Sequence, residues 1–313
     1  MPLPRALAAS VLLWSCVTLA SPKVRILGSI EGGKPQPAWV YARSGQRVLL
    51  HADAPAAVKS LRWYRIEPTT RSADNTQPSF HWAPISYRTD ELTACRDQRT
   101  CTPDVTPVHM PRNGHLQGLG TMAFQLEAVL PDGTTLKTPG ADSLDRGGLS
   151  RHVFRVAIRK SDSYTGYLSE LANTPYIFGS AGAEGSHQAD LLVGSDCADL
   201  AVYGIRRAGR TDVPYVSTWT IEKHAPLVAV AEQRTRDGTY ATATQKPITH
   251  AREGDLILFP STRHVGVLWE DRDPVGVLDE NDLLLHTCWA PPTVEPLGTA
   301  ACSALPMRVL RFR

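Results

Sequence analysis

The chain has 313 residues, of which 42% are hydrophobic and 20% charged, and its formal net charge is only +2. This is the composition of an ordinary globular protein, and the length favours two domains. So small a net charge provides no electrostatic basis for binding nucleic acid. The sequence has no paired Cys-x-x-Cys motifs and no His-rich tract, which argues against a structural zinc site. We expect neither a metal ion nor an organic cofactor.

Residues 1–20 are predicted to form an export signal. Arg5 precedes a short apolar run, and Thr18-Leu19-Ala20 offers small residues for cleavage before Ser21. The run is too short to cross a bilayer as a stable helix. One alternative is a lipoprotein acylated at Cys16, and another is an apolar segment that is not cleaved. We expect a protein exported to the periplasm or the cell exterior, either free or anchored through Cys16.

Residues 22–160 are predicted to form a β-sandwich. Short runs rich in strand-forming residues lie at 46–52, 61–66, 122–130 and 152–159. Pro131-Asp132-Gly133 follows the third run and predicts a hairpin with 134–137. A strand that bears Trp63, together with a late hairpin, resembles an immunoglobulin-like domain, and Trp63 is expected in its core. The polar stretch 90–118 is predicted to be a long loop.

Residues 163–313 are predicted to form an α+β domain. A short helix is expected at 164–172, and a loop rich in Gly, Ala and Ser follows at 180–186. The helix at 196–209 is well marked, since Ser195 or Asp196 can cap its start and Gly209 ends it. Its apolar stripe is expected at Ala198, Ala201, Val202, Ile205 and Ala208. Strands are expected at 254–259, 264–268, 283–286 and 308–312, so one helix precedes a run of strands.

The cysteines divide into pairs and one remainder. Cys16 is removed or lipidated if the chain is exported, which leaves five, and four of these are expected to pair in an oxidising compartment. Cys95 and Cys101 flank a short polar loop, and Cys288 and Cys302 flank a Pro-rich segment. Cys197 remains. An unpaired thiol in an exported protein is open to oxidation, which favours a functional reason for it over a buried, inert thiol.

Cys197 stands where a tight turn becomes a helix, and two histidines follow on apolar strands. His264 opens one of these strands and His286 ends another. A helix N-terminus favours thiolate over thiol, and a nearby imidazole can take the thiol proton and return it to a leaving group. The pattern predicts a cysteine hydrolase, with purely structural histidines as the alternative. Three further histidines lie in polar loops and are expected to be solvated: His187, His224 and His250.

Four sequence blocks resemble the NlpC-type cell-wall peptidases, a papain-like family of secreted bacterial cysteine hydrolases. The similarity covers about half of the chain, from Tyr164 to Arg313. The blocks are Pro175-Tyr176-Ile177-Phe178-Gly179, Asp196-Cys197-Ala198-Asp199-Leu200, Val213-Pro214-Tyr215-Val216-Ser217-Thr218, and Gly254-Asp255-Leu256 with His264-Val265-Gly266-Val267. The resemblance implies a papain-like domain in which a helix bearing the cysteine packs on an antiparallel sheet.

The resemblance also implies the catalytic roles. Cys197 would attack an amide carbonyl, His264 would act as general base and then acid, and His286 would orient His264 as the third member of a triad. Asp282 or Asn281 is the alternative orienting group. The backbone N–H of Cys197 would stabilise the oxyanion.

The substrate contacts implied by the resemblance are Tyr176, Asp196 and Ser217, with Asp196 facing an amine of the peptide. Tyr176 as a core aromatic and Asp196 as a simple helix cap are the alternatives. The sequence departs from the family where Ala198-Asp199 replaces Ser-Gly. Asp199 is expected to point to solvent or to a backbone donor.

The predicted function is an exported cysteine hydrolase that cleaves amide bonds in peptidoglycan stem peptides, as an endopeptidase. Two alternatives stand beside it. One is a catalytically silent cell-wall-binding protein, which Ala198-Asp199 would favour. The other is a cysteine amidase or acyltransferase with a substrate outside the wall. The sandwich would position the catalytic half, or dock on the wall or on a protein partner.

Overall fold

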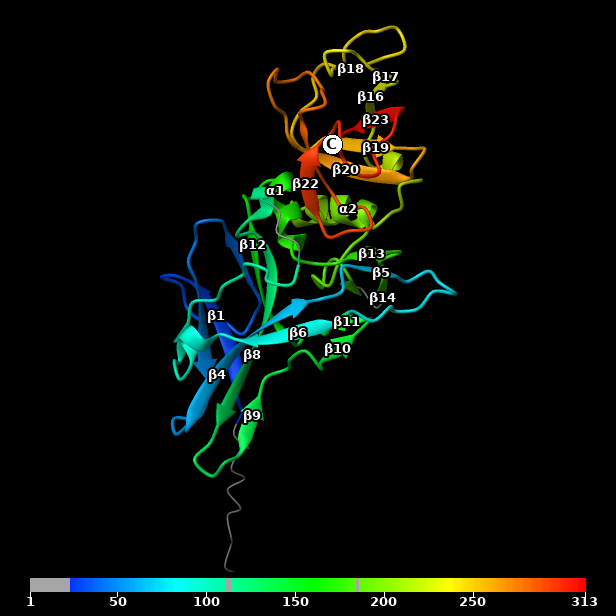
Figure 1. Cartoon of the computed structure of the whole chain (residues 1–313). Coiled ribbons are helices and arrows are strands. Elements are labelled where there is room, and N and C mark those ends of the chain that lie inside the picture. Colours follow the sequence, from blue (N-terminus) through cyan, green and yellow to red (C-terminus); the bar gives the residue numbers. More distant parts are fainter. Residues whose placement is uncertain (1–22, 111–113, 184–185) are drawn as a thin grey trace, which may run out of the picture.

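The computed structural model describes residues 23–110, 114–183 and 186–313. The predicted export signal and Cys16 lie outside these residues. The described chain is a mixed α+β structure in which strands predominate (Figure 1). Within it, every helix is too short or too polar to cross a membrane.

The first half of the chain forms two sheets that share an apolar core. The larger sheet has the order β2 (Val40–Arg43), β12 (Phe154–Arg159), β8 (Gly120–Val129), β4 (Ser60–Pro68) and β6 (Tyr87–Glu91), with β9 (Thr135–Lys137) also paired to β8. The smaller sheet consists of β1 (Arg25–Ile30), β3 (Val48–Asp53) and β7 (Thr100–Cys101). Trp63 is fully buried between them, as expected, and its Nε1 donates to the carbonyl of Gln98 at 2.8 Å.

Two predictions for this half are tested directly by the strand pairing. The hairpin around Asp132-Gly133 is confirmed, because β8 pairs with β9. The long loop at 90–118 is only partly a loop, since it contains η1 (Thr93–Cys95), β7 and η2 (Gly114–Leu116). β7 pairs with β3 and completes the smaller sheet. A short two-stranded ribbon of β10 (Leu144–Asp145) and β11 (Gly148–Leu149) precedes β12.

The second half places one helix against one antiparallel sheet. After α1 (Tyr164–Leu168) and η3 (Ser169–Leu171) comes α2 (Cys197–Arg207), which packs on the sheet through residues such as Ala198 and Ala201 against Val265 and Val267. The sheet order is β16 (Leu227–Ala231), β23 (Met307–Leu310), β19 (Leu256–Phe259), β20 (His264–Glu270), β21 (Leu283–His286) and β22 (Thr293–Pro296). Smaller elements are β14 (Gly182–Ala183), β15 (Ser186–His187), η4 (Ile221–Lys223), β17 (Gln233–Arg234) and β18 (Tyr240–Ala241).

The helical stripe predicted for α2 is largely confirmed. Ala198, Ala201, Val202 and Ile205 are buried. Ala208 is exposed, because it is the C-cap residue and lies beyond the last helical turn that faces the sheet. The apolar face of the helix therefore packs on the sheet. Its N-terminus, at Cys197, lies near β13, the strand of this half that pairs with the first half.

The two halves are joined by strand pairing and by buried polar contacts. β5 (Ser72–Asp74) from the first half runs parallel to β13 (Tyr176–Phe178) from the second. Next to this pair, Nδ2 of the buried Asn75 donates to Oε1 of Gln188 at 2.9 Å and to the carbonyl of Gly179 at 3.1 Å. These contacts hold the segment that leads to Cys197 against the first half. The domain boundary near residue 160 stays a prediction.

The predicted disulfide pattern is confirmed. Cys95 is joined to Cys101, and Cys288 to Cys302. Cys197 is the free cysteine of the described chain. Two disulfides are consistent with an exported protein.

Candidate active site

Cys197 is held at the first position of α2 by the turn before it. Asp196 has extended backbone and caps the helix, since its Oδ1 accepts from the N–H of Asp199 at 2.9 Å. Gly194 lies against β13, where a Cβ would come within 2.5 Å of the carbonyl oxygen of Pro175. The N–H of Ile177 donates to the carbonyl of Ser195 at 2.9 Å. The turn is therefore tied to β13, and the thiol is placed beside Tyr176.

Cys197 is half-buried and lines a cleft of about 420 Å³. The cleft combines mainly aromatic and aliphatic surface with a few polar groups, as ligand sites usually do. Four other residues predicted for the site also line it: Tyr176, Asp196, Ser217 and His264. Tyr176 is buried and Ser217 exposed. His286 does not line the cleft but lies behind His264.

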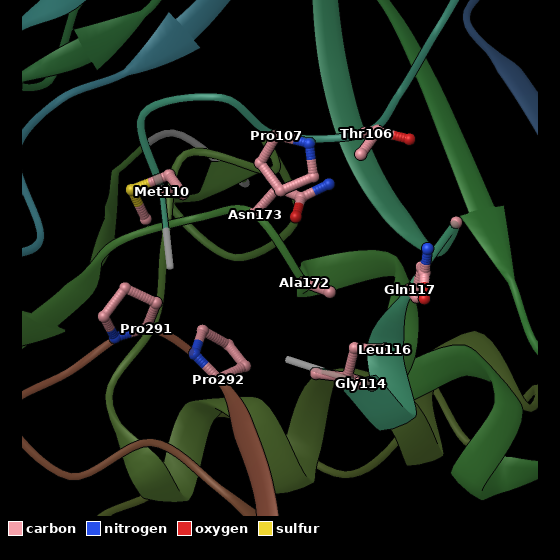
Figure 2. Close-up of a pocket in the computed structure, with 11 residues that line it drawn as sticks. Thr106, Pro107, Met110, Gly114, Leu116, Gln117, Ala172, Asn173, Pro291 and Pro292 are labelled. Carbon is pink, nitrogen blue, oxygen red and sulfur yellow. The ribbon is translucent and has the colours of Figure 1, made fainter. Parts of the chain in front are cut away.

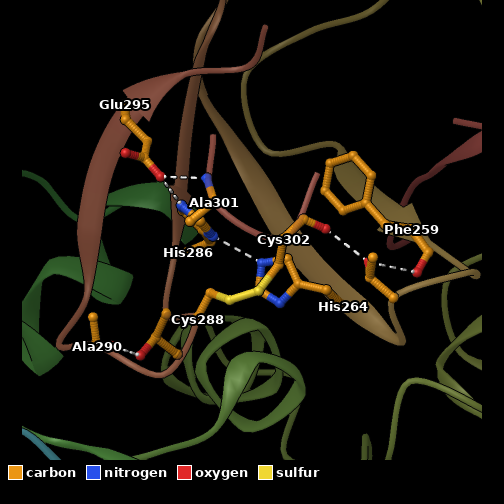
Figure 3. The surroundings of a disulfide bond; sticks show 10 residues. Phe259, His264, His286, Cys288, Ala290, Glu295, Ala301 and Cys302 are labelled. Atoms are coloured by element: carbon orange, nitrogen blue, oxygen red, sulfur yellow. Dashed lines mark hydrogen bonds and ion pairs between the residues drawn. A yellow bond between two sulfur atoms is a disulfide. The ribbon is translucent and has the colours of Figure 1, made fainter. Parts of the chain in front are cut away.

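His264, His286 and Glu295 form a chain of hydrogen bonds across three neighbouring strands (Figure 3). His264 Nε2 lies 2.8 Å from His286 Nδ1, and His286 Nε2 lies 2.7 Å from Glu295 Oε1. The antiparallel register, which pairs Val267 with Leu285, brings the start of β20 next to the end of β21. The structure thus places His286 against His264. Asp282, an alternative from the sequence, instead accepts the backbone N–H groups of Arg272 and Asp279.

The hydrogen bonds define which ring nitrogen of His264 is free. The bond from His286 lowers the pKa of the Glu295 carboxyl, so Glu295 is an ionised acceptor. His286 then donates from Nε2 and accepts at Nδ1, and His264 donates from Nε2. This arrangement leaves the lone pair on Nδ1 of His264 for proton transfer.

His264 is held in its neutral form. Burial, followed by the neighbouring His286, lowers the pKa of His264 to about 3, against an opposing effect of Glu295. The ring also lies parallel to that of Phe259, with centroids 5.9 Å apart. A neutral imidazole is the form that a general base requires.

The Cys197 thiol is held neutral as well, which corrects the expectation from the helix N-terminus. Burial raises the pKa of Cys197 to about 12, and the carboxylates of Asp196 and Asp199 add to the rise. A backbone hydrogen bond from Val265 opposes it without reversing it. The partial charge of a helix terminus is weaker than desolvation together with two adjacent acidic groups. The resting cleft is therefore lined by a neutral thiol and a neutral imidazole.

Asp199 is buried, and the expectation that it points to solvent is wrong. The hydroxyl of Ser180 donates to Asp199 Oδ2, and His187 Nε2 lies 3.5 Å from the same oxygen. The N–H of Asp196 in turn donates to Ser180 Oγ at 3.0 Å. Burial, then the charge of Asp196, raises the pKa of Asp199 well above its ordinary value. Asp199 thus holds the turn before Cys197 in place through Ser180, which contacts both Asp199 and the backbone of Asp196.

His187 is also buried, although its polar sequence context predicted a solvated side chain. Its ring stacks on Tyr215 with centroids 3.8 Å apart. The hydroxyl of Tyr215 donates to Asp190 Oδ1 at 2.6 Å. The polar loop folds back over the start of α2, which single-sequence periodicity cannot show.

Several cleft residues were not predicted from the sequence. Trp289 and Phe178 line the cleft and pack at a centroid distance of 5.3 Å, and Trp219, which also lines it, stacks with the guanidinium of Arg263 at 4.5 Å. Both tryptophans are exposed. The sequence could have indicated the two tryptophans, because Trp219 lies close to Ser217 and Trp289 directly follows Cys288. Glu295 was missed because only strand pairing connects it to His286.

The Cys288–Cys302 disulfide forms a wall of the cleft next to His264 (Figure 3). The ligand atoms of these three residues lie within 4.8 Å of one another, and they are the group in the described chain that could hold a metal ion. With the disulfide formed, neither sulfur is a thiolate. In the oxidised protein these two sulfurs therefore do not act as thiolate ligands.

A second cavity, of about 160 Å³, lies where residues 106–110 and 114–118 meet Pro291 and Pro292 (Figure 2). Asn173 also lines it, and none of its described lining residues has an ionisable side chain. The cleft at Cys197, which combines a free thiol with an imidazole, is therefore the stronger candidate site.

The neutral state of the thiol predicts a steep pH dependence of its alkylation. Iodoacetamide should modify Cys197 about tenfold faster per pH unit between pH 7 and 9, since the thiolate fraction rises tenfold per unit below the pKa. Asp196→Asn keeps the cap but removes a charge that raises the thiol pKa, so alkylation at pH 8 should become about tenfold faster. Mass spectrometry of the modified peptide measures both rates.

Two controls accompany this experiment. Asp212→Asn removes an exposed carboxylate that contacts Arg210 outside the cleft and should leave the rate unchanged. Cys197→Ala provides the blank. A rate that is constant from pH 7 to 9 would show a thiolate–imidazolium pair instead and would contradict the neutral site.

Comparisons with models of protein families, with curated proteins and with solved structures find no match for this chain. The resemblance to NlpC-type peptidases therefore stays a prediction from the sequence blocks.

Proposed function

We propose that the protein is an exported cysteine hydrolase of the NlpC type, which cleaves amide bonds in peptidoglycan stem peptides as an endopeptidase. The observation that carries this proposal is that a free thiol at a helix N-terminus and His264 line one cleft, while His264 is hydrogen-bonded to His286 and His286 to Glu295 behind it. A nucleophile beside a base that is itself oriented by a third group is the arrangement common to acyl-transfer enzymes. The helix on its antiparallel sheet supports a papain-like domain, and the two facing sheets support an immunoglobulin-like one.

The reaction begins with a thiol and an imidazole that are both neutral. Prior proton transfer from Cys197 to His264 is far uphill, because the pKa values are about 12 and about 3. The proton must therefore move to Nδ1 as Sγ bonds to the amide carbon. His264 then gives the proton to the leaving nitrogen as the C–N bond breaks, which leaves a thioester. Water attacks this thioester with His264 again as base, and the acid product and the thiol are released.

The polar and aromatic groups of the cleft provide for substrate binding. Asp196 faces the cleft beside the thiol and would pair with an ammonium group of the stem peptide. Such a cation would also offset the charge that raises the thiol pKa, so binding would favour the nucleophilic form. Tyr176 and the exposed tryptophans would pack against the rest of the substrate. Ser217, which also lines the cleft, would contribute a hydroxyl.

The experiment that tests the proposal is a digest of purified muropeptides, with products identified by mass spectrometry. The protein should release new peptide fragments, and Cys197→Ala should release none. His250→Ala, which changes an exposed histidine outside the cleft, should release the same fragments as the unchanged protein. A thiol that reacts with iodoacetamide but yields no fragments would reject the wall substrate and leave the amidase or acyltransferase alternative.

A second candidate, a catalytically silent cell-wall-binding protein, is favoured by one observation. Two carboxyl groups, Asp196 and Asp199, flank the nucleophile and raise its pKa. Sedimentation with purified cell walls, combined with failure of an electrophilic probe to label Cys197, would support this candidate. Labelling that disappears in Cys197→Ala would support the enzyme.

A further inference from the structure

The Cys288–Cys302 disulfide and His264 form a corner of the cleft whose donor atoms converge from three segments of the chain. His264 begins β20, Cys288 follows β21, and Cys302 lies between β22 and β23. One ligand atom of each lies within 4.8 Å of the others. Bonds of about 2.3 Å to sulfur and about 2.0 Å to nitrogen place the ligand atoms of a tetrahedral zinc ion about 3.5–3.8 Å apart. Small side-chain rotations would bring all three to one ion.

We propose that reduction of this disulfide converts the corner into a Zn²⁺ site held by His264, Cys288 and Cys302, with the fourth position open to the cleft. Two thiolates and one imidazole are ligands that zinc prefers, and three protein ligands with an open position are typical of accessible zinc sites. A phosphine and water reduce the disulfide to two thiols and become the phosphine oxide. Zn²⁺ then displaces one proton from each thiol.

The two cysteines are held in place by contacts that do not depend on the S–S bond. The hydroxyl of Thr262 donates to the carbonyl of Cys302 at 2.7 Å, and the N–H of Ala301 donates to Glu295 Oε1 at 2.8 Å. Next to Cys288, the hydroxyl of Thr287 donates to the carbonyl of Ala290 at 2.5 Å. Figure 3 shows dashed lines for these contacts near both cysteines of the disulfide. The thiols should therefore stay close together after reduction.

His264 is already oriented as a metal ligand would be. Histidines that bind metals usually donate from their other ring nitrogen to a fixed acceptor, which holds the ring and its tautomer. Nε2 of His264 lies 2.8 Å from His286, which is itself bonded to Glu295. The free nitrogen is Nδ1, the same atom that serves as the base in the proposed function. Bound zinc would therefore block proton transfer and silence the hydrolase in reducing conditions.

The test uses the full protein with Co²⁺ and Zn²⁺ as probes, under anaerobic conditions. After treatment with a phosphine reductant, the protein should bind one Co²⁺ per chain with the thiolate-to-cobalt absorption and the visible bands of a tetrahedral site, and Zn²⁺ should displace it. The oxidised protein should bind at least about 100-fold more weakly. Cys288→Ser/Cys302→Ser should abolish the signal, and His264→Ala, which keeps both thiols, should weaken binding at least about tenfold.

The matched control is Cys95→Ser/Cys101→Ser, which removes the other disulfide and should leave cobalt binding unchanged. The site does not exist if the reduced protein binds no Co²⁺, or if it binds equally with Cys288 and Cys302 replaced. The absorption does not depend on hydrolysis, so failure of the proposed function leaves this result intact. Where the hydrolase is active, zinc should inhibit only the reduced form, and a chelator should restore activity.

Discussion

Replacement of His264 by alanine should lower kcat for muropeptide cleavage by about 10³-fold, within the range that a general acid–base group contributes. The residue is the one imidazole that lines the cleft with Cys197 in the described chain. Nδ1 acts three times in the proposed reaction: it takes the thiol proton, gives it to the leaving nitrogen, and takes a proton from the attacking water. Steady-state kinetics on a defined stem peptide measures the loss.

His286→Ala should have a smaller effect, about 10²-fold, because His286 acts only through His264. It should also move the acid limb of the kcat/KM profile to higher pH. After burial, the neighbouring His286 is the second cause that lowers the pKa of His264, so its removal lets that pKa rise toward its usual value. Protonation then disables the base at a higher pH than before. Measurement from pH 3 to 8 would detect the change.

Glu295→Gln tests the end of the chain of hydrogen bonds. The amide can still accept from His286 Nε2 but carries no charge, so the loss should be no more than about tenfold. An acid limb that stays in place in His286→Ala, together with full activity, would show that His286 has no role in the reaction. His250→Ala is the matched histidine control.

Replacement of Glu170 by alanine should destabilise the fold by about 3–5 kcal/mol. Glu170 is fully buried and accepts from Arg207 Nε at 2.7 Å and from the hydroxyl of Tyr203 at 2.5 Å, and Arg159 lies 3.4 Å away. Arg159 ends β12, whereas the other two partners lie on α2. Loss of the carboxylate would leave these groups facing each other at the junction of the halves without their acceptor.

Urea unfolding followed by tryptophan fluorescence measures this change. Glu170→Gln, which keeps an acceptor but no charge, should be intermediate. Glu31→Ala removes one partner of an exposed ion pair with Arg47 and should leave the unfolding midpoint unchanged. A midpoint of Glu170→Ala equal to that of the unchanged protein would show that the junction does not depend on this contact.

The local elements of this protein follow from local sequence signals. The helix at Cys197 was predicted because a capping residue, an apolar stripe and a final glycine occur together. The hairpin at Asp132-Gly133 was predicted from turn chemistry, and the disulfides from cysteine spacing and redox compartment. The helix and the hairpin depend on interactions between residues close in the sequence. The disulfides could be predicted because five cysteines allow only a few pairings.

The errors fall where distant segments meet. Asp199 and His187 are buried because a polar loop folds over the start of α2. The stretch 90–118 contributes β7 because β3 lies beside it. The thiol of Cys197 is neutral because burial and two nearby carboxyl groups raise its pKa. From the sequence, only the effect of the helix N-terminus could be recognised.

The sequence by itself determined the nature of the reactive groups: one unpaired thiol, histidines on strands, and two cysteine pairs. Only the tertiary structure decided which groups touch, namely His286 with Glu295 behind His264, and the Cys288–Cys302 disulfide at its side. The physical reason is the distance along the chain over which each interaction acts. Helix caps, turns and periodicity act over a few residues, whereas burial and the electrostatic field at a side chain depend on segments that only the folded sheet brings together.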